Sequence, residues 1–333
     1  MSDCKNQTLF DIIHSMKEKI IMDTDWGSDQ STQTAVLLSQ PDRFEIMGAM
    51  VTFGNAAHHY VLQNAGNLLQ FLGATHIPYY PGSTEPSDQP QKHGDHAFGD
   101  NGIGDVIFEP ATRPPEKINA VDYILETLKS NAPQTITLLA TGPQANISRA
   151  IQKDPETMKR LKQILIMGGG VEDMPAADRP TRRGNIEPDA EFNFNQAPHD
   201  ADIVVNSGIP IILFPLNCTH QLTLTPKRQE MIRTTFKDQP DITDKILGML
   251  MAPQDLERTK FGIDPVLHDV HTALYLTAPQ QYSGRKGFLK ISENGRSDFT
   301  EDENGTVFTM DQIQSADKLF QIVLTSLANI LLK

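Results

Sequence analysis

Cysteine is scarce in this sequence of 333 residues, which contains Cys4, Cys218 and no other thiol. Two cysteines are too few for a disulfide framework, and their spacing matches no metal-binding motif. A reducing compartment is the simpler expectation, although two thiols do not exclude secretion. Residues 1–19 carry three acidic side chains and lack the basic-then-apolar order of a signal peptide. We therefore predict a cytoplasmic protein.

Positive charge and long apolar runs are also lacking. The sequence has 29 Lys and Arg residues against 42 Asp and Glu residues, which gives a formal net charge of −13. Nucleic-acid binding depends on basic side chains that neutralise phosphates, so this charge argues against a general nucleic-acid partner. No uninterrupted apolar run approaches the roughly 18 residues of a membrane-spanning helix, so we expect no membrane partner.

The remaining composition is that of a globular protein. With 22 glycines, 22 prolines and 38% hydrophobic residues, the chain is neither disordered, collagen-like nor a coiled coil. A chain of this length buries roughly three quarters of its unfolded surface and needs no covalent staples. Since the sequence shows no internal repeat and no linker, we predict a single domain over 1–333, with an N-terminal extension over 1–18.

Five short apolar runs recur, each followed at once by a polar or glycine-rich segment. The runs are continuous rather than alternating, which is typical of parallel strands that are buried on both faces. Helical patterns lie between them at spacings that suit βαβ units. We therefore predict an α/β fold with one open, mostly parallel sheet flanked by helices. The expected strands are 20–22, 46–53, 135–140, 164–167 and 209–216, and the expected helices are 31–38, 60–72, 119–128, 146–151 and 198–205.

The C-terminal third is less regular. Residues 222–251 predict helices, 252–265 a loop, 266–278 a helix and 313–332 a closing helix. Between the last two, 287–291 and 306–310 predict a two-stranded edge hairpin within 285–312. The 250–265 segment is a candidate wall over a bound ligand, whereas the polar 81–91 loop gives no readable contact.

Polar side chains stand at every predicted strand end. In an open parallel sheet, ligands bind outside the carboxyl ends of the strands, so one pocket could collect these side chains. The alternative is that the glycines and asparagines only form turns and helix caps. Five such loops together favour the pocket.

Three carboxylates, Asp23, Asp25 and Asp29, lie within seven residues at the end of the first predicted strand. Burial and mutual repulsion raise their pKa values, so a cation, a protonated partner or helix amides must compensate. Hard oxygen ligands at short spacing suit Ca²⁺ or Mg²⁺ rather than zinc. Alternatively, Asp29 caps the next helix while Asp23 and Asp25 hold loop amides.

The run from Asp23 to Asp29, Asp-Thr-Asp-Trp-Gly-Ser-Asp, resembles the N-terminal motif D-T-D-P-G-x-D-D of the inosine-uridine preferring nucleoside hydrolases. No single later match is decisive, but the ordered series covers most of the chain and is highly specific. The later matches are 51–55, 98–104, 141–146, 167–170, 184–185 with 190–193, 219–220 and 268–269.

The resemblance implies a hydrolase of purine or pyrimidine salvage that releases the base from a ribonucleoside or a related ribosyl compound. It implies one Ca²⁺ ion at the pocket floor, and a homo-oligomer, either a dimer or a tetramer. Asp25 would be the general base and His268 would face the leaving base. The implied metal ligands are Asp25, Gln30, the Thr141 carbonyl and Asp269, and the implied sugar contacts are Asp29, Asn55, Asn185, Glu191 and Asn193.

These residue types suit the implied chemistry. Cleavage of an N-glycosidic bond passes through an oxocarbenium-like state, whose developing positive charge is stabilised by carboxylate and amide oxygens. A bound metal makes water nucleophilic near neutral pH, and a histidine can protonate or hydrogen-bond the departing base.

Two residues depart from the family motif. Gln30 stands where the family has a second Asp, and an uncharged ligand predicts weaker Ca²⁺ binding. This leaves an alternative from another class, namely a protein that binds a nucleoside without cleaving it. Trp26 replaces Pro, so its indole either contacts the substrate base or packs against a neighbouring helix.

Other residues receive no catalytic role. His220 is expected to buttress a strand end, and His58, His59 and His271 are expected to be solvated or to lie on helix faces. A dinucleotide-binding Rossmann enzyme is disfavoured, because the Gly168–Gly170 run does not have the G-x-G-x-x-G spacing.

Overall fold

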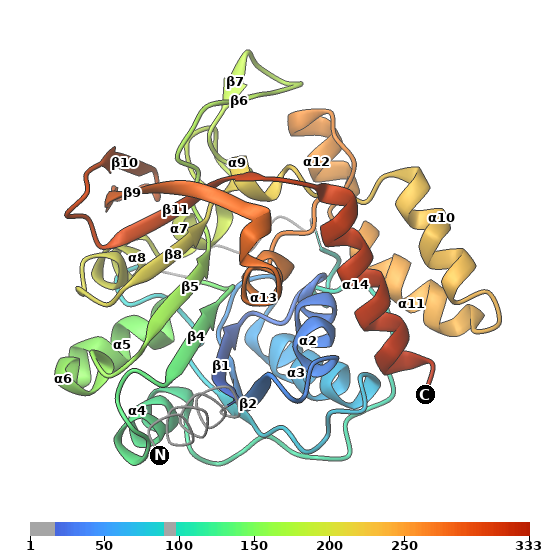
Figure 1. The fold of residues 1–333 in the computed structure, drawn as a ribbon, viewed down its shortest axis with the longest axis horizontal. Coiled ribbons are helices and arrows are strands. Elements are labelled where there is room, and N and C mark those ends of the chain that lie inside the picture. The colour runs from blue at the N-terminus through green and yellow to red at the C-terminus, as the bar shows by residue number, and fades with distance from the viewer. Residues whose placement is uncertain (1–16, 90–97) are drawn as a thin grey trace, which may run out of the picture.

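The computed structural model of the protein describes residues 17–89 and 98–333. Its main element is a nine-stranded sheet in the order β10-β9-β11-β8-β5-β4-β1-β2-β3 (Figure 1). Neighbouring strands from β3 to β11 are all parallel, while β9 is antiparallel to both β11 and β10. The predicted α/β fold with an open, mostly parallel sheet is confirmed.

The predicted strand and helix order holds through the first two thirds of the chain. The strands of the main sheet are β1 (Glu18–Thr24), β2 (Phe44–Val51), β3 (Tyr79–Pro81), β4 (Ile136–Ala140), β5 (Gln163–Met167), β8 (Ile211–Phe214), β9 (Tyr282–Ile291), β10 (Ser297–Glu301) and β11 (Val307–Ile313). A separate pair is formed by β6 (Met174–Pro175) and β7 (Thr181–Arg182). The helices are α2 (Gln30–Leu38), α3 (His58–Phe71), α4 (Ala120–Ser130), α5 (Ala145–Lys153), α6 (Pro155–Met158), α7 (Phe192–Gln196), α8 (Pro198–Val205), α9 (Leu216–Thr219), α10 (Pro226–Thr235), α11 (Pro240–Met251), α12 (Gln254–Phe261), α13 (Val270–Thr277) and α14 (Ala316–Leu331), with a 3₁₀ turn at Pro279–Gln281.

The continuous apolar run of β1 supplies two cores, because successive side chains of a strand point to opposite faces of the sheet. Ile20 and Met22 pack into a core that also contains side chains of α2, α3, α13 and α14. Ile21 packs into a second core with side chains of α4, α5 and α8. These two groups of helices lie on opposite sides of the sheet in Figure 1. A strand buried on both faces therefore needs no polar alternation.

The sheet reverses its direction of growth between β1 and β4. From β1 the chain adds β2 and β3 on one side, and then crosses to add β4, β5 and β8 on the other. Since β1 and β4 are parallel neighbours, the residues that follow them emerge side by side. Such a reversal opens a crevice at the carboxyl ends of the strands, where open α/β sheets bind ligands. Asp25 and Thr141 follow these two strands.

The segment 252–265, which was expected to be a loop, contains the helix α12. Its eight residues include only two large apolar side chains, Leu256 and Phe261, so the helical period was too weak to read. The end signals are nevertheless present in the sequence. Acidic residues occupy the first turn, basic residues occupy the last turn, and Gly262 adopts the left-handed conformation at the C-terminus with φ of 70°.

The C-terminal strands also differ from the expected two-stranded edge hairpin over 285–312. β9 and β11 do pair in antiparallel fashion, but β11 lies inside the sheet next to β8. The polar stretch between them contains a third strand, β10, which forms the edge. A solvent-exposed edge strand needs few apolar residues, so its sequence resembles a loop.

Two further expectations concern the chain ends and the membrane. The predicted N-terminal extension 1–18 lies outside the described residues except for its last two positions, and β1 already begins at Glu18. Among the helices in the described ranges, none combines the length and the apolar character needed to cross a bilayer.

Candidate active site

One cavity beside the carboxyl ends of β1 and β4 gathers nine of the eleven site residues named from the sequence. Gln30 and Trp26 are the two that do not line it. The lining consists of Asp25, Ser28, Asp29, Asn55, Phe98, Thr141, Met167, Asn185, Glu191, Phe192, Asn193, Pro253, His268 and Asp269. Within the described part of the chain this lining contains three aspartates and a glutamate but no lysine or arginine, so His268 alone among the lining side chains can oppose their negative charge.

Asp25 lies at the floor of the cavity, two residues along the chain from Asp23. Its Oδ2 accepts a hydrogen bond from the Asn55 amide at 3.1 Å, whereas its buried Oδ1 has no hydrogen-bond partner among the described residues. Gly54 permits this approach, because a Cβ atom there would lie 2.0 Å from Asp25 Oδ2. Burial raises the pKa of Asp25 well above its usual range, and the charges of Asp29 and Glu191 raise it further.

Asp29 and Asp269 join the start of α2 to the start of α13. Asp29 occupies the N-cap position of α2 but makes no side-chain cap bond. Its Oδ2 instead accepts a hydrogen bond of 2.8 Å from the backbone amide of Asp269. Burial raises the pKa of Asp269 well above its usual range, and the charges of Asp29 and Asp25 add to this effect. The sequence alternative, in which Asp29 caps α2, is therefore not the arrangement found.

Gln30 lies directly behind this acidic group and is fully buried. Its Nε2 donates a hydrogen bond to Asp269 Oδ2, and a longer one of 3.4 Å to Thr141 Oγ1. Its Oε1 is buried without a hydrogen-bond partner in the described residues. The side chain that departs from the family motif thus contacts two of the implied metal ligands.

The donor set fits a hard divalent cation. Asp25 Oδ1 and Gln30 Oε1 are buried oxygens without partners, and an unsatisfied buried acceptor is costly. Burial raises the pKa values of Asp25 and Asp269, and the charges of neighbouring carboxylates raise them further. The oxygen and nitrogen of a Gln side chain are nearly identical in shape, so half a turn of the Gln30 amide presents an oxygen in place of its NH₂. Carboxylate and amide oxygens are the ligands that Ca²⁺ takes.

Glu191 organises the opposite wall of the cavity. As the N-cap of α7, it accepts hydrogen bonds from the amides of Asn193 at 2.8 Å and Phe194 at 3.1 Å, and from Gly169 at 2.8 Å. Burial raises the pKa of Glu191, and these amide bonds partly oppose the shift. Asn193 in turn donates to the Met167 carbonyl at 3.1 Å, so the wall is fixed to the end of β5.

We expect Glu191→Ala to lower the free energy of unfolding by about 3 kcal/mol, because three buried amides lose their acceptor. Urea denaturation followed by circular dichroism would measure the change. Glu187→Ala, on the exposed part of the same loop, is the control and should change stability by less than about 0.5 kcal/mol. Equal stability of the two variants would contradict the structural role of Glu191.

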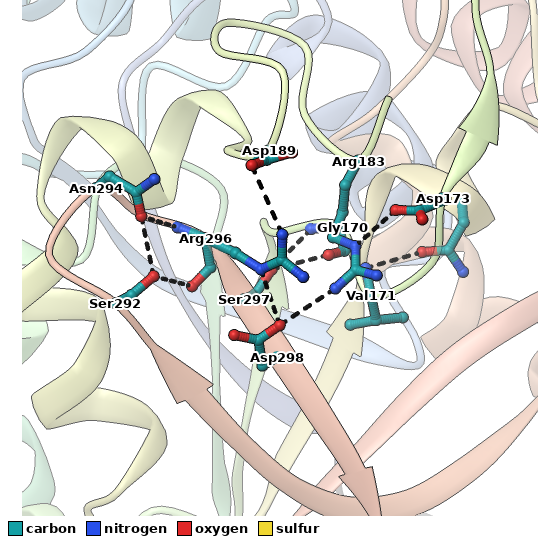
Figure 2. Close-up of polar contacts among 11 residues, drawn as sticks. Gly170, Val171, Asp173, Arg183, Asp189, Ser292, Asn294, Arg296, Ser297 and Asp298 are labelled. Atoms are coloured by element: carbon teal, nitrogen blue, oxygen red, sulfur yellow. Dashed lines mark hydrogen bonds and ion pairs between the residues drawn. The ribbon is translucent and has the colours of Figure 1, made fainter. Parts of the chain in front are cut away.

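The loop that carries Asn185 is fastened to the β9–β10 turn, taken here as residues 292–298 so that it includes the first two residues of β10. Figure 2 shows this contact through Arg183 and Asp189 of the loop. Buried Ser297 accepts a hydrogen bond from the Gly170 amide at 2.9 Å and donates one to its carbonyl at 3.0 Å. Arg183 bonds Asp298 at 3.2 Å, while Arg296 lies 3.6 Å from Asp189 and also bonds Asp298. The C-terminal strands thus position two loops of the cavity.

His268 lines the cavity and is held from two sides. Its Nδ1 lies 2.8 Å from Thr219 Oγ1, and its Nε2 lies 3.3 Å from Glu257 Oε1. The hydrogen bond and charge of Glu257 raise the pKa of His268 against the lowering effect of burial. Glu257 comes from α12, and sequence reasoning missed it because that helix was interpreted as a loop.

Trp26, the residue proposed from the sequence to contact the substrate base, is not among the residues that line the cavity. Its side chain is fully buried in the core, and its Nε1 lies 3.4 Å from the Met50 carbonyl that it faces. The backbone of Trp26 adopts φ of 39°, a left-handed conformation that turns the chain from β1 towards α2. The indole packs inward, as the second sequence interpretation proposed.

Two other histidines are also placed by the structure. His271 lies on the helix α13, which is one of its two expected placements, and it is fully buried there rather than solvated, with its Nδ1 3.0 Å from the Tyr282 hydroxyl. Burial lowers its pKa to about 3, so the ring is neutral. His220 follows α9, just beyond the end of β8, and its ring lies near those of Phe261 and His268.

Comparison with known proteins gives a consistent result. The chain is 35% identical over 274 residues to an uncharacterized protein of Schizosaccharomyces pombe, covering 82% of this chain and 84% of that protein. It is 29% identical over 278 residues to a pyrimidine-specific ribonucleoside hydrolase of Escherichia coli O157:H7, covering 84% of each chain. A solved purine-preferring ribonucleoside hydrolase from Gardnerella vaginalis has the same fold, with a TM-score of 0.82 at 23% identity over 95% of this chain and all of that one.

The model of one protein family matches residues 20–325, which is nearly the whole described chain. The match includes β1 with the acidic cluster, both walls of the cavity and the β9–β11 strands that support them. The resemblance first seen in short motifs therefore extends through the complete fold. This chain belongs to the inosine-uridine preferring nucleoside hydrolase family.

Proposed function

We propose that this nucleoside hydrolase cleaves the bond between base and ribose of a ribonucleoside, or of a related ribosyl compound, with Ca²⁺ as its metal. The observation that supports this most directly is the set of unbalanced carboxylates around the unpartnered Oδ1 of Asp25. The proposed ligands of the ion are Asp25, Gln30, the Thr141 carbonyl and Asp269.

Each step of the proposed reaction uses residues of this chain. A Ca²⁺ ion bound at these ligands would supply positive charge that balances the carboxylates and would make water easier to deprotonate. Asp25 acts as general base and takes a proton from the attacking water, while its Oδ2 is held by the Asn55 amide at 3.1 Å. His268 faces the leaving base and donates a hydrogen bond or a proton to it as the glycosidic bond breaks.

The remaining residues are proposed to grip the sugar. Carboxylate and amide oxygens stabilise the positive charge that develops on the ribose ring, and they do so best when the fold holds them in place beforehand. Hydrogen bonds to backbone groups hold the side chains of four of them, namely Asp29, Asn185, Glu191 and Asn193. The proposed sugar contacts are Asp29, Asn55, Asn185, Glu191 and Asn193.

Release of free base tests this function. The purified protein is incubated with purine, pyrimidine and modified ribonucleosides, with added Ca²⁺ or with a chelator, and free base is measured by chromatography. We expect release with Ca²⁺, near-complete loss with chelator, and recovery when Ca²⁺ is restored. The panel includes both base classes because the similar proteins include a pyrimidine-specific and a purine-preferring enzyme. Folded protein that releases no base from any compound would contradict the proposal.

We also propose a cytoplasmic homo-oligomer, either a dimer or a tetramer, that acts in purine or pyrimidine salvage. The low cysteine content supports the cytoplasmic location. The oligomer is proposed from the family resemblance, and closed symmetry is the usual form of soluble homo-oligomers. Light scattering coupled to size-exclusion chromatography would give the mass in solution, and a mass of 37.0 kDa would mean a monomer.

A further inference from the structure

A second group of metal-ligating side chains adjoins the cavity and has no part in the proposed calcium site. It consists of His220, Glu257 and His268, whose nearest ligand atoms all lie within 4.8 Å of one another. Three separate segments supply it, because His220 follows α9, Glu257 lies on α12 and His268 precedes α13. Since His268 also lines the cavity, the two sites adjoin through this residue.

Two polar atoms of this group lack partners. His220 Nε2 and Glu257 Oε2 lie 4.0 Å apart, which is too long for a hydrogen bond. Neither atom has a hydrogen-bond partner among the described residues. Both atoms are buried, and the Glu257 side chain as a whole is only 1% exposed, so water does not replace the missing partners. Leaving a buried carboxylate oxygen unsatisfied is costly. A cation between the two atoms would satisfy both at once.

The donor set indicates which cation this is. Two imidazole nitrogens and one carboxylate oxygen form a set used by zinc in proteins, whereas Ca²⁺ and Mg²⁺ take oxygen ligands. With metal–ligand distances of about 2.1 Å, tetrahedral ligand atoms lie about 3.4 Å apart. The separation of Glu257 Oε1 and His268 Nε2 is already 3.3 Å. His220 Nε2 lies 4.0 Å from the other carboxylate oxygen, Oε2, so the two histidines approach different oxygens of Glu257 and would have to close on one ion by about 0.6 Å or more.

The surroundings hold His220 in its metal-binding form and orient His268, whose proton the ion would displace because Glu257 raises its pKa against the effect of burial. Burial lowers the pKa of His220 to about 4, so its ring is neutral and can offer a lone pair. Thr219 Oγ1 engages His268 Nδ1 at 2.8 Å, which directs the other ring nitrogen towards Glu257. Such a contact to the distant nitrogen is the usual support of a metal-bound histidine. Phe261 packs edge-on against the ring of His220, with centroids 4.5 Å apart.

We propose that His220, Glu257 and His268 form a binding site for one Zn²⁺ ion beside the nucleoside cavity. The site has three protein ligands, which leaves a fourth position for water or another small ligand. Its donors differ in kind from the oxygen ligands around Asp25, so the protein would separate a soft cation from a hard one by chemistry alone. An ion held by His268 Nε2 would occupy the nitrogen that His268 otherwise offers to the leaving base, because its Nδ1 contacts Thr219 Oγ1; zinc binding and assistance to the leaving base therefore exclude each other. The inference itself does not rest on hydrolytic activity or on the calcium site.

Zinc binding is tested on the full-length protein in excess Ca²⁺, so that the oxygen-rich site is already filled. Zn²⁺ is titrated in competition with a chromophoric chelator, and Co²⁺ is used as a spectroscopic substitute. We expect the unmodified protein to bind one equivalent of Zn²⁺. In Glu257→Gln and in His220→Gln, the affinity of the protein for Zn²⁺ should fall by about 100-fold or more. Bound Co²⁺ should show the strong visible bands of a four-coordinate ion, and Zn²⁺ should displace them.

Two control variants locate the bound ion. His59→Gln changes an exposed histidine outside the cluster, and Asp25→Asn changes the calcium side; both should keep the zinc equivalent. The proposal is overturned if no zinc binds, if Glu257→Gln and His220→Gln bind it normally, or if Asp25→Asn loses it. Should the cluster variants fail to fold, the Co²⁺ spectrum of the unmodified protein decides, because a weak six-coordinate spectrum rules out this site.

Discussion

Asp25→Asn should reduce kcat/KM for nucleoside cleavage by about 1,000-fold or more, which corresponds to about 4 kcal/mol of transition-state stabilisation. The change removes the proposed general base and one charged metal ligand together. The amide oxygen can still accept the hydrogen bond that Asp25 takes from the Asn55 amide. Because burial raises the pKa of Asp25, removing its charge should not destabilise the fold. Steady-state kinetics and thermal unfolding of the same preparation measure both effects.

Asp302→Asn is the matched control for this experiment. Asp302 lies on an exposed turn between β10 and β11, where its carboxylate accepts a hydrogen bond from the Asn304 amide. The same chemical change there should leave turnover and stability unaltered. If Asp25→Asn retains turnover, Asp25 is not the base. If it instead unfolds, the carboxylate has a structural role that the structure does not reveal.

Gln30→Asp should tighten Ca²⁺ binding by about tenfold or more, because the number of charged ligands tunes such sites over orders of magnitude. The effect without metal should be the reverse. Gln30 now donates a hydrogen bond to Asp269, and an aspartate at this position would place another negative charge in a group that already lacks counter-charge. In chelator, we therefore expect Gln30→Asp to melt at a lower temperature than the unmodified protein. On adding Ca²⁺, the melting temperature of Gln30→Asp should rise by more than that of the unmodified protein.

Calorimetric titration gives the affinity, and thermal unfolding with and without Ca²⁺ gives the linked stability. Gln40→Asp adds the same charge two residues after α2, away from the cavity, and so controls for general electrostatic attraction of the cation. Only the Gln30 variant should gain affinity. Unchanged affinity of Gln30→Asp would mean that residue 30 does not face the metal.

The parts of the fold that could be predicted are those in which sequence pattern and burial agree. The first five predicted strands are continuous apolar runs that enter two cores, as Ile20 and Ile21 show on opposite faces of β1. By contrast, β10 and α12 lie near the surface, where few apolar residues are needed. Their sequences therefore show weak helical or strand periodicity. For α12 the sequence features typical of a helix are those at its ends, such as Gly262 after its last residue, and they did not outweigh the weak periodicity.

The same distinction explains the site. Residues at strand ends, such as Asp25 and Thr141, could be assigned to one pocket because parallel strands end at one edge of the sheet. The direction of a side chain within a turn could not be read, since the left-handed backbone of Trp26 turns its indole into the core. Glu257 could not be found either, because its partners lie 37 residues before it and 11 residues after it in the chain.

The loop that carries Asn185 and the glycine segment beside it are fastened to the β9–β10 turn in two different ways. Ser297 is only 1% exposed where it grips Gly170, whereas the Asp298 and Asp189 carboxylates that hold Arg183 and Arg296 are more than half exposed. Dissolved ions screen exposed charge pairs and have little effect on a shielded hydroxyl. Rising ionic strength should therefore loosen the Asn185 side of the pocket while the glycine segment stays in place.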